Sequence, residues 1–98
     1  MASVQLRRYV LPLDHAEQDR WIEWWRGISA PRALYGFTIP FAVLDRGTGE
    51  FTWTVQHESD DFDTVEAEYM TSPERNAVME LDKPEITTAR IAMVDDIV

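Results

Sequence analysis

Residues 35–78 constrain the fold of this chain more than any other part of the sequence. Residues 37–44 and 50–57 are rich in β-forming side chains, and Gly47 and Gly49 lie in the short connection between them. Glycine allows the positive φ angles that tight hairpin loops need. The sequence therefore predicts two antiparallel strands, and the acidic, aromatic-bearing segment that follows predicts a helix that packs against them.

The residues before this run predict one further strand and one helix. Residues 4–11 alternate with the period of a half-buried strand, which Pro12 ends. Asp14 and Glu17 have the spacing of a capping box at the start of a helix. Apolar side chains then recur at helical spacing, which predicts that one face of this helix packs on a sheet. These side chains are Trp21, Trp24, Trp25 and Ile28.

The residues after the hairpin predict a second helical region and a last strand. Cap-forming residues precede a helix whose apolar side chains share one side, and a Ser-Pro pair then begins a last helical segment that extends to about residue 81. The final strand is expected over residues 86–94. The aligned apolar side chains of the second helix are Phe62, Val65 and Tyr69.

The resulting order, β-α-β-β-α-β, is typical of the α+β ferredoxin-like fold, in which helices cover one face of a four-stranded antiparallel sheet. A length of 98 residues suits one domain, so residues 1–98 are assigned to a single domain. The uncovered face is predicted to be neither fully charged nor fully apolar, which suits a subunit interface. We therefore expect a homodimer with its sheets face to face. The residues expected on the dimer face are Gln5, Arg7, Tyr9, Pro40, Ala42, Leu44, Thr52, Thr54 and Gln56.

Charge and composition argue against several kinds of partner and site. Eighteen acidic and nine basic residues give a net charge of −9, which repels phosphate backbones and anionic membrane surfaces, so no nucleic acid or membrane partner is expected. The absence of cysteine removes disulfides and thiolate metal sites, and a cytoplasmic location is expected. His15 and His57 match no recognised metal-binding spacing, so neither a metal nor another cofactor is expected.

Four short motifs together resemble the NIPSNAP family. They are Gln5-Leu6-Arg7-Arg8-Tyr9, Pro31-x-x-x-Tyr35-Gly36-Phe37, Glu50-Phe51-x-Trp53 and Tyr69-x-x-Ser72-Pro73-Glu74-Arg75. The chain departs from the family at Gln5, where the family usually has Glu, and after Leu81. The resemblance implies a dimeric α/β barrel, a group that also includes small cofactor-independent monooxygenases, muconolactone-isomerase-like proteins and haem-binding relatives. Because the family has no settled biochemical activity, the resemblance gives no residue a role.

Aromatic side chains are the candidates for a ligand pocket. Stacked indoles can line a site for a flat aromatic ligand, and such a site would lie between the helices and the sheet if the core is incompletely filled. The competing interpretation is that the rings fill the core, which is the ordinary role of an aromatic stripe on a helix. The candidate pocket residues are Trp21, Trp25, Trp53 and Tyr69.

Few residues are candidates for catalysis or charge recognition. His57 lies close to several carboxylates in the sequence, which makes proton transfer conceivable, although a solvated or capping histidine is the simpler interpretation. Tyr69 is the second catalytic candidate. Arg7 is expected to pair with a carboxylate across the dimer or to bind one from a ligand. For Arg75 we expect an ion pair with a neighbour such as Glu68, the alternative being a ligand contact.

Three functions are consistent with these observations. The first, which ranks highest because no catalytic set is recognised, is a NIPSNAP-like homodimeric module that binds a small molecule or a protein. The second is a cofactor-independent enzyme of monooxygenase or isomerase type, acting on an aromatic or lactone-like substrate. Its candidate pocket consists of Tyr9, His57, Tyr69 and the tryptophans. The third is a haem-binding protein with His57 or His15 as the axial ligand, suggested only by analogy with the superfamily.

Overall fold

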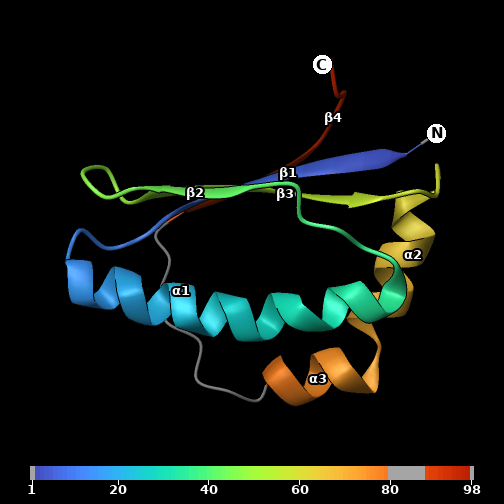
Figure 1. Cartoon of the computed structure of the whole chain (residues 1–98), viewed down its shortest axis with the longest axis horizontal. Coiled ribbons are helices and arrows are strands. Elements are labelled where there is room, and N and C mark those ends of the chain that lie inside the picture. The colour runs from blue at the N-terminus through green and yellow to red at the C-terminus, as the bar shows by residue number, and fades with distance from the viewer. Residues whose placement is uncertain (1, 80–87, 98) are drawn as a thin grey trace.

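The computed structural model describes residues 2–79 and 88–97, which form one layer of strands and one of helices (Figure 1). The elements are β1 (Ser3–Val10), α1 (His15–Ser29), the 3-10 helix η1 (Ala30–Tyr35), β2 (Ala42–Asp45), β3 (Glu50–His57), α2 (Phe62–Met70), α3 (Pro73–Met79) and β4 (Thr88–Val94). The sheet has the order β2-β3-β1-β4, and every neighbouring pair is antiparallel. This confirms the predicted ferredoxin-like arrangement. The predicted helix end near residue 81 and strand start at residue 86 lie outside the described residues.

The helices cover one face of the sheet, which Figure 1 shows nearly edge-on with the helices below it. The core between the two layers is mainly aromatic, and β3 contributes its Phe51, Trp53 and Val55 to it, as the alternation of that strand predicts. Trp21 and Trp25 of α1 pack onto these residues, with ring centroids 4.8 Å and 5.1 Å from Phe51. Among the described residues, no helix is both long and apolar enough to span a membrane.

The prediction that Arg7 and Tyr9 lie on the uncovered face of the sheet is wrong. Arg7 pairs in register with Trp53, and Tyr9 with Phe51, so both side chains share the helix-covered face with the core of β3. The same register places Gln5, Ala42 and Leu44 on the covered face. Thr52, Thr54 and Gln56 do lie on the open face, together with Val4, Leu6, Val10, Val43 and Val94. The alternation of β1 correctly separated Leu6 and Val10 from Gln5, Arg7 and Tyr9, but the first and more apolar set lies on the open face.

The first hairpin strand is shorter than residues 37–44 because proline interrupts its ladder. Pro40 has no N–H to donate to a neighbouring strand. An isolated bridge between Thr38 and Gln56 precedes it, and regular pairing resumes only at Ala42. The left-handed Gly36, with φ of 84°, ends η1 and turns the chain into this segment.

Gly49 closes the β2–β3 turn against the chain that leaves β1. Its φ is 77°, and its carbonyl accepts a hydrogen bond from the Leu11 N–H at 2.8 Å. Its own N–H donates to the Asp45 carbonyl, also at 2.8 Å. A Cβ at this position would collide with the Leu11 carbonyl oxygen, and an L-residue disfavours the left-handed conformation.

Gly49→Ala is therefore expected to lower the free energy of unfolding by about 2 kcal/mol, measured by urea denaturation. Gly27→Ala is the matched control, because a Cβ at this exposed position of α1 meets nothing within 4 Å. Alanine's higher helix propensity predicts that this control gains up to about 1 kcal/mol. Loss of stability in the control, or no loss in Gly49→Ala, would contradict this description of the turn.

Candidate functional site

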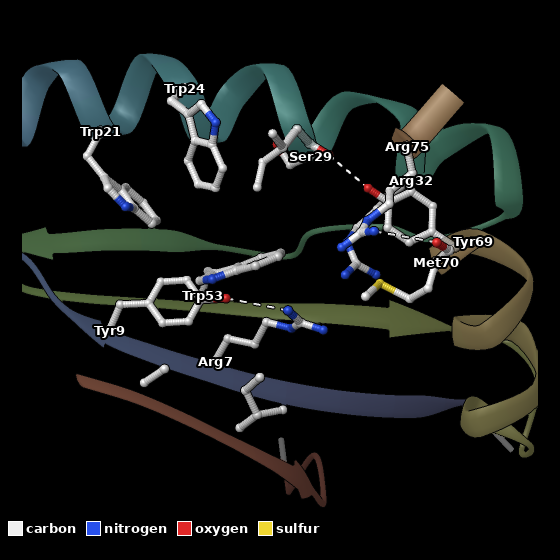
Figure 2. Close-up of a pocket in the computed structure, with 13 residues that line it drawn as sticks. Arg7, Tyr9, Trp21, Trp24, Ser29, Arg32, Trp53, Tyr69, Met70 and Arg75 are labelled. Atoms are coloured by element: carbon white, nitrogen blue, oxygen red, sulfur yellow. Dashed lines mark hydrogen bonds between the residues drawn. The ribbon is translucent and has the colours of Figure 1, made fainter. Parts of the chain in front are cut away.

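A cavity of about 230 Å³ lies between the helices and the part of the sheet formed by β1, β3 and β4. Figure 2 shows the side chains that surround it, which come from both layers of the fold. Its lining is largely aromatic and apolar, and the polar part is dominated by arginine. The aromatic lining residues are Tyr9, Trp21, Trp24, Trp53 and Tyr69. The charged lining residues are Arg7, Arg32 and Arg75.

Ring-to-ring contacts hold the aromatic wall of the cavity. The Tyr9 ring centroid lies 5.5 Å from Trp21 and 6.4 Å from Trp53, in edge-to-face geometry in both cases. The Trp24 ring lies 5.8 Å from Trp21, tilted against it. These are favoured aromatic geometries, so the rings brace one another while leaving faces and edges for a flat ligand.

The aromatic candidates divide between pocket and core. Trp21, Trp53 and Tyr69 line the cavity, as one of the two interpretations proposed. Trp25 is not among the lining residues, because its ring is packed between Phe51 and Trp53, with centroids at 5.1 Å and 5.3 Å. Its role is the core packing of the competing interpretation. The same helical stripe therefore supplies both a wall of the cavity and a filler of the core.

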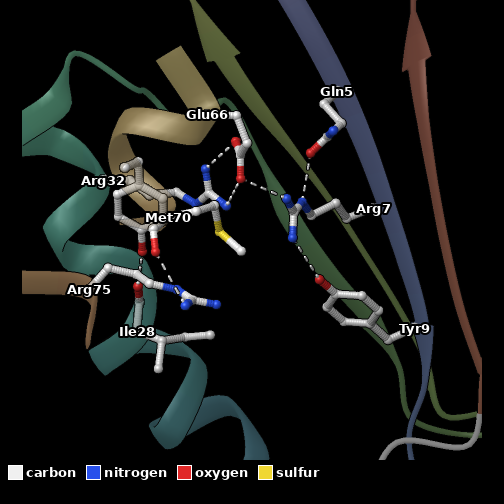
Figure 3. Close-up of polar contacts among 9 residues, drawn as sticks. Gln5, Arg7, Tyr9, Ile28, Arg32, Glu66, Met70 and Arg75 are labelled. Carbon is white, nitrogen blue, oxygen red and sulfur yellow. Dashed lines mark hydrogen bonds and ion pairs between the residues drawn. The ribbon is translucent and has the colours of Figure 1, made fainter. Parts of the chain in front are cut away.

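Glu66 of α2 joins two arginines at one end of the cavity (Figure 3). Arg32 binds it with both terminal nitrogens, at 3.0 Å and 3.1 Å, and Arg7 Nη2 lies 3.2 Å from Glu66 Oε1. Arg7 also donates to Gln5 Oε1 at 2.8 Å. The side chains of Arg32, Arg7 and Glu66 are only 5%, 15% and 16% exposed, so these are partly desolvated ion pairs.

Aromatic faces make the burial of Arg32 tolerable. Its guanidinium carbon lies 4.4 Å from the Tyr69 ring centroid, 5.2 Å from Phe37 and 5.7 Å from Trp53. Arginine is weakly hydrated for a cation and stacks on rings, which suits it to such a site. The charge is thus satisfied by a carboxylate at its edge and by ring faces around it.

Sequence reasoning missed Arg32 and Glu66. Arg32 carries no local signal, because one cation in a short 3-10 turn is ordinarily exposed. Glu66 did offer a signal: it lies four residues after Phe62 and three before Tyr69, which puts a carboxylate on the buried side of α2. An acidic residue there predicts a buried cation, although it does not say which one.

Tyr69 is fixed as a neutral phenol. Its hydroxyl donates a hydrogen bond to the Ile28 carbonyl at 2.8 Å. Burial raises the pKa of Tyr69 above its ordinary value, against the opposing influence of Arg32 and the other nearby arginines. A phenol that is already donating and is harder to ionise is a poor general base. It positions the α1–α2 contact and presents its ring to Arg32.

The two histidines do not fit the catalytic and haem-ligating roles considered for them. His57 Nδ1 accepts from the Ser59 N–H at 3.0 Å, so Nε2 carries the proton and donates to the Tyr35 carbonyl at 2.9 Å. His15 is exposed at the start of α1, and neither histidine lines the cavity. Haem ligation needs a free imidazole nitrogen beside a suitable space, so these residues do not fit haem. His57 is a capping histidine, the simpler of its two interpretations.

Arg75 lies at the cavity instead of in the predicted ion pair. It makes no salt bridge with Glu68 or any other residue within 2–79 and 88–97. Within these ranges its guanidinium makes one hydrogen bond, a long one of 3.5 Å from Nη1 to the Met70 carbonyl. The ligand-contact alternative is therefore the one that its position favours.

Comparisons with known proteins find similarity in fold and not in sequence. No protein-family model matches the chain, and no curated protein matches it. An uncharacterized NIPSNAP-like domain protein from Burkholderia xenovorans has a TM-score of 0.71 at 15% identity, over 98% of this chain and 85% of that one. A NIPSNAP family protein of unknown function from Agrobacterium tumefaciens gives 0.73 at 12% identity, over 95% and 86%. A protein from Bacteroides thetaiotaomicron, provisionally named an antibiotic biosynthesis monooxygenase, gives 0.67 at 10%, over 99% and 90%.

These neighbours confirm the predicted resemblance at the level of the fold. The chain has the ferredoxin-like α+β architecture that the two NIPSNAP structures and the third neighbour share. Identities of 10–15% do not carry an activity from one protein to another. The cavity and the surfaces of this chain are therefore the features that bear on its function.

Proposed function

We propose that this protein is a NIPSNAP-like binding module whose cavity holds a small, flat, largely apolar molecule. The observation that carries the proposal is the aromatic cavity of about 230 Å³ between the two layers. Drug-sized ligands occupy roughly 300–1,000 Å³, so this space suits a molecule of one or two rings. The braced rings of Tyr9, Trp21 and Trp24 supply surfaces on which such a molecule stacks.

Binding is favoured over catalysis by the chemistry of the lining. Among the described residues, the cavity is lined by no histidine and no carboxylate, and Tyr69 is engaged as a hydrogen-bond donor. Proton transfer needs a base within reach of the substrate. A monooxygenase- or isomerase-type activity remains the second candidate, supported by the fold neighbour that carries a provisional monooxygenase name.

The indole N–H signals of the four tryptophans provide the test of the binding site. On titration with the neutral probe 2-naphthalenemethanol, the NMR signals of Trp21, Trp24 and Trp53 are expected to shift, and that of Trp25 least, because Trp25 lies in the core. Trp24→Ala is expected to weaken binding about tenfold, since it removes one stacking surface.

Leu34→Ala is the control for this variant, because Leu34 is 70% exposed and lies outside the lining. It is expected to leave the affinity unchanged. If all four indole signals move equally, or if Trp24→Ala binds the probe as the unmodified chain does, the cavity is not the binding site.

We also propose that two copies associate through the open face of the sheet. This face carries the apolar side chains of Val4, Leu6 and Val10 in β1, one of the two central strands, with Val43 at one edge and Val94 at the other. Val43 is 56% exposed and Val94 36%, so the apolar surface reaches both edges. A face of this kind is a typical interface between subunits.

Light scattering at micromolar concentration is expected to give about twice the chain mass of 11.4 kDa. Leu6→Glu places a charge at the middle of the face and is expected to give a folded monomer. Leu13→Glu is the control, because Leu13 is 64% exposed but lies outside the sheet, and it is expected to leave the dimer intact. A monomeric, folded unmodified chain would contradict the proposal.

A further inference from the structure

The charge around the cavity is opposite to the charge of the whole chain. The protein carries a net charge of −9, yet the charged residues of the described lining are three arginines. Glu66 is the carboxylate paired with Arg7 and Arg32, and it is not itself one of the lining residues. Within the described residues, three guanidinium groups are paired with one carboxylate, which leaves an excess of two positive charges at a partly desolvated site, a condition that favours an anion.

The three arginines differ in how far their donors are already used. Arg32 is clamped to Glu66 through both terminal nitrogens and covered by rings. Each nitrogen of the Arg7 guanidinium already has a partner among Gln5, Tyr9 and Glu66. Among the residues that the structure describes, the Arg75 guanidinium has only its long bond to the Met70 carbonyl, although a guanidinium carries five N–H donors. Figure 3 shows its guanidinium directed towards the space that separates it from Arg7.

The hydrogen-bond donors of the aromatic lining residues also favour a ligand that carries acceptors. Within the described part of the chain, the indole nitrogens of Trp21, Trp24 and Trp53, like that of the core residue Trp25, are buried and have no hydrogen-bond partner. The first three of these residues line the cavity. An indole nitrogen only donates, so the unused polar groups on both sides of the space are donors. A hydrocarbon ligand would leave them unpaired, whereas a ligand with oxygen acceptors can bind them.

We infer that the ligand of the cavity is a small aromatic carboxylate, with its ring against Tyr9, Trp21 and Trp24 and its carboxylate against Arg75. The inference rests on the proposed binding function and names the ligand class. A planar carboxylate matches the fork of a guanidinium and can accept two parallel hydrogen bonds. A single negative charge also suits a mainly apolar cavity better than a phosphate dianion, which costs more to desolvate.

A matched pair of probes tests the charge separately from the ring. The probes are 2-naphthoate and the neutral 2-naphthalenemethanol, titrated against the full chain at neutral pH by NMR or calorimetry. The unmodified protein is expected to bind naphthoate about tenfold more tightly, which is the effect of one charge-assisted hydrogen-bonded pair. Arg75→Gln is expected to abolish this preference, because it weakens naphthoate binding about tenfold more than it weakens binding of the alcohol. Added salt is expected to weaken only naphthoate binding.

Arg26→Gln is the control, because the Arg26 side chain is 70% exposed and lies outside the lining. It is expected to keep the naphthoate preference. If both probes bind the unmodified protein equally, or if Arg75→Gln keeps the preference, the carboxylate inference is wrong and the binding function stands. If neither probe binds, the binding function fails with it.

Discussion

Replacing Glu66 by glutamine is expected to lower the free energy of unfolding by about 3 kcal/mol. Removing one member of a buried ion pair leaves an uncompensated charge, which typically costs about 3–5 kcal/mol. Here two cations lose their carboxylate at once, since Arg32 and Arg7 both bind Glu66. The amide oxygen of glutamine can still accept one hydrogen bond, so we expect the lower end of that range. Urea denaturation of the purified variant measures the loss.

Glu68→Gln is the matched control for this variant. Glu68 lies on the same helix, two residues further along, but is exposed, so its replacement is expected to change stability by no more than about 0.5 kcal/mol. In the double variant Arg32→Met with Glu66→Leu, the loss is expected to be smaller than the sum of the two single losses, because the Arg32–Glu66 pair is then removed as a whole and only Arg7 loses its partner. A Glu66→Gln loss no larger than that of Glu68→Gln would show that the cluster is solvated.

The fold was predictable because local signals in the chain agree with one another. The Asp14 carboxylate accepts a hydrogen bond from the Glu17 N–H at 3.0 Å, which is half of the predicted capping box. The helix α1 begins directly after Asp14, at His15. Gly36 and Gly49 take the left-handed conformations that break the chain between elements. Each signal acts within a few residues, so a single sequence shows it without any knowledge of tertiary contacts.

The faces of β1 were not predictable in the same way. Alternation identifies which residues share a face, but the choice of the buried face follows from what the opposite layer offers. Leu6 and Val10 are the more apolar pair, yet Arg7 and Tyr9 face the helices. Arg7 can do so because Glu66 of α2 supplies a carboxylate from 59 positions away. That long-range pairing leaves no trace in the strand itself.

The candidate site was predictable in its aromatic part only. Helical spacing in α1 and alternation in β3 directed Trp21 and Trp53 towards each other, and both line the cavity. The polar part depends on Arg32 and Arg75, which follow separate turns and meet only in the folded chain. The same spacing could not distinguish Trp25 from its neighbours, since pocket and core positions recur with the same period.

Trp25→Ala is expected to lower the free energy of unfolding by about 4 kcal/mol, the range for a large buried aromatic side chain truncated to alanine. Trp25 is 9% exposed, and its ring packs edge-to-face against both Phe51 and Trp53. Truncation removes both aromatic contacts and leaves a void between α1 and β3 that rigid neighbours cannot fill. Chemical denaturation followed by circular dichroism measures the change without relying on the lost indole.

Two further substitutions separate packing from the binding function. Trp25→Phe keeps an aromatic ring in the same space and is expected to lose less than half as much stability, because most of the apolar contact is retained. Leu34→Ala, at a 70% exposed position, is expected to change stability by no more than about 0.5 kcal/mol. Since Trp25 does not line the cavity, the folded Trp25→Phe variant should bind 2-naphthalenemethanol with unchanged affinity.

A loss below about 1 kcal/mol in Trp25→Ala would place this ring outside the core. Unchanged stability with weakened probe binding in Trp25→Phe would instead make Trp25 a wall of the pocket.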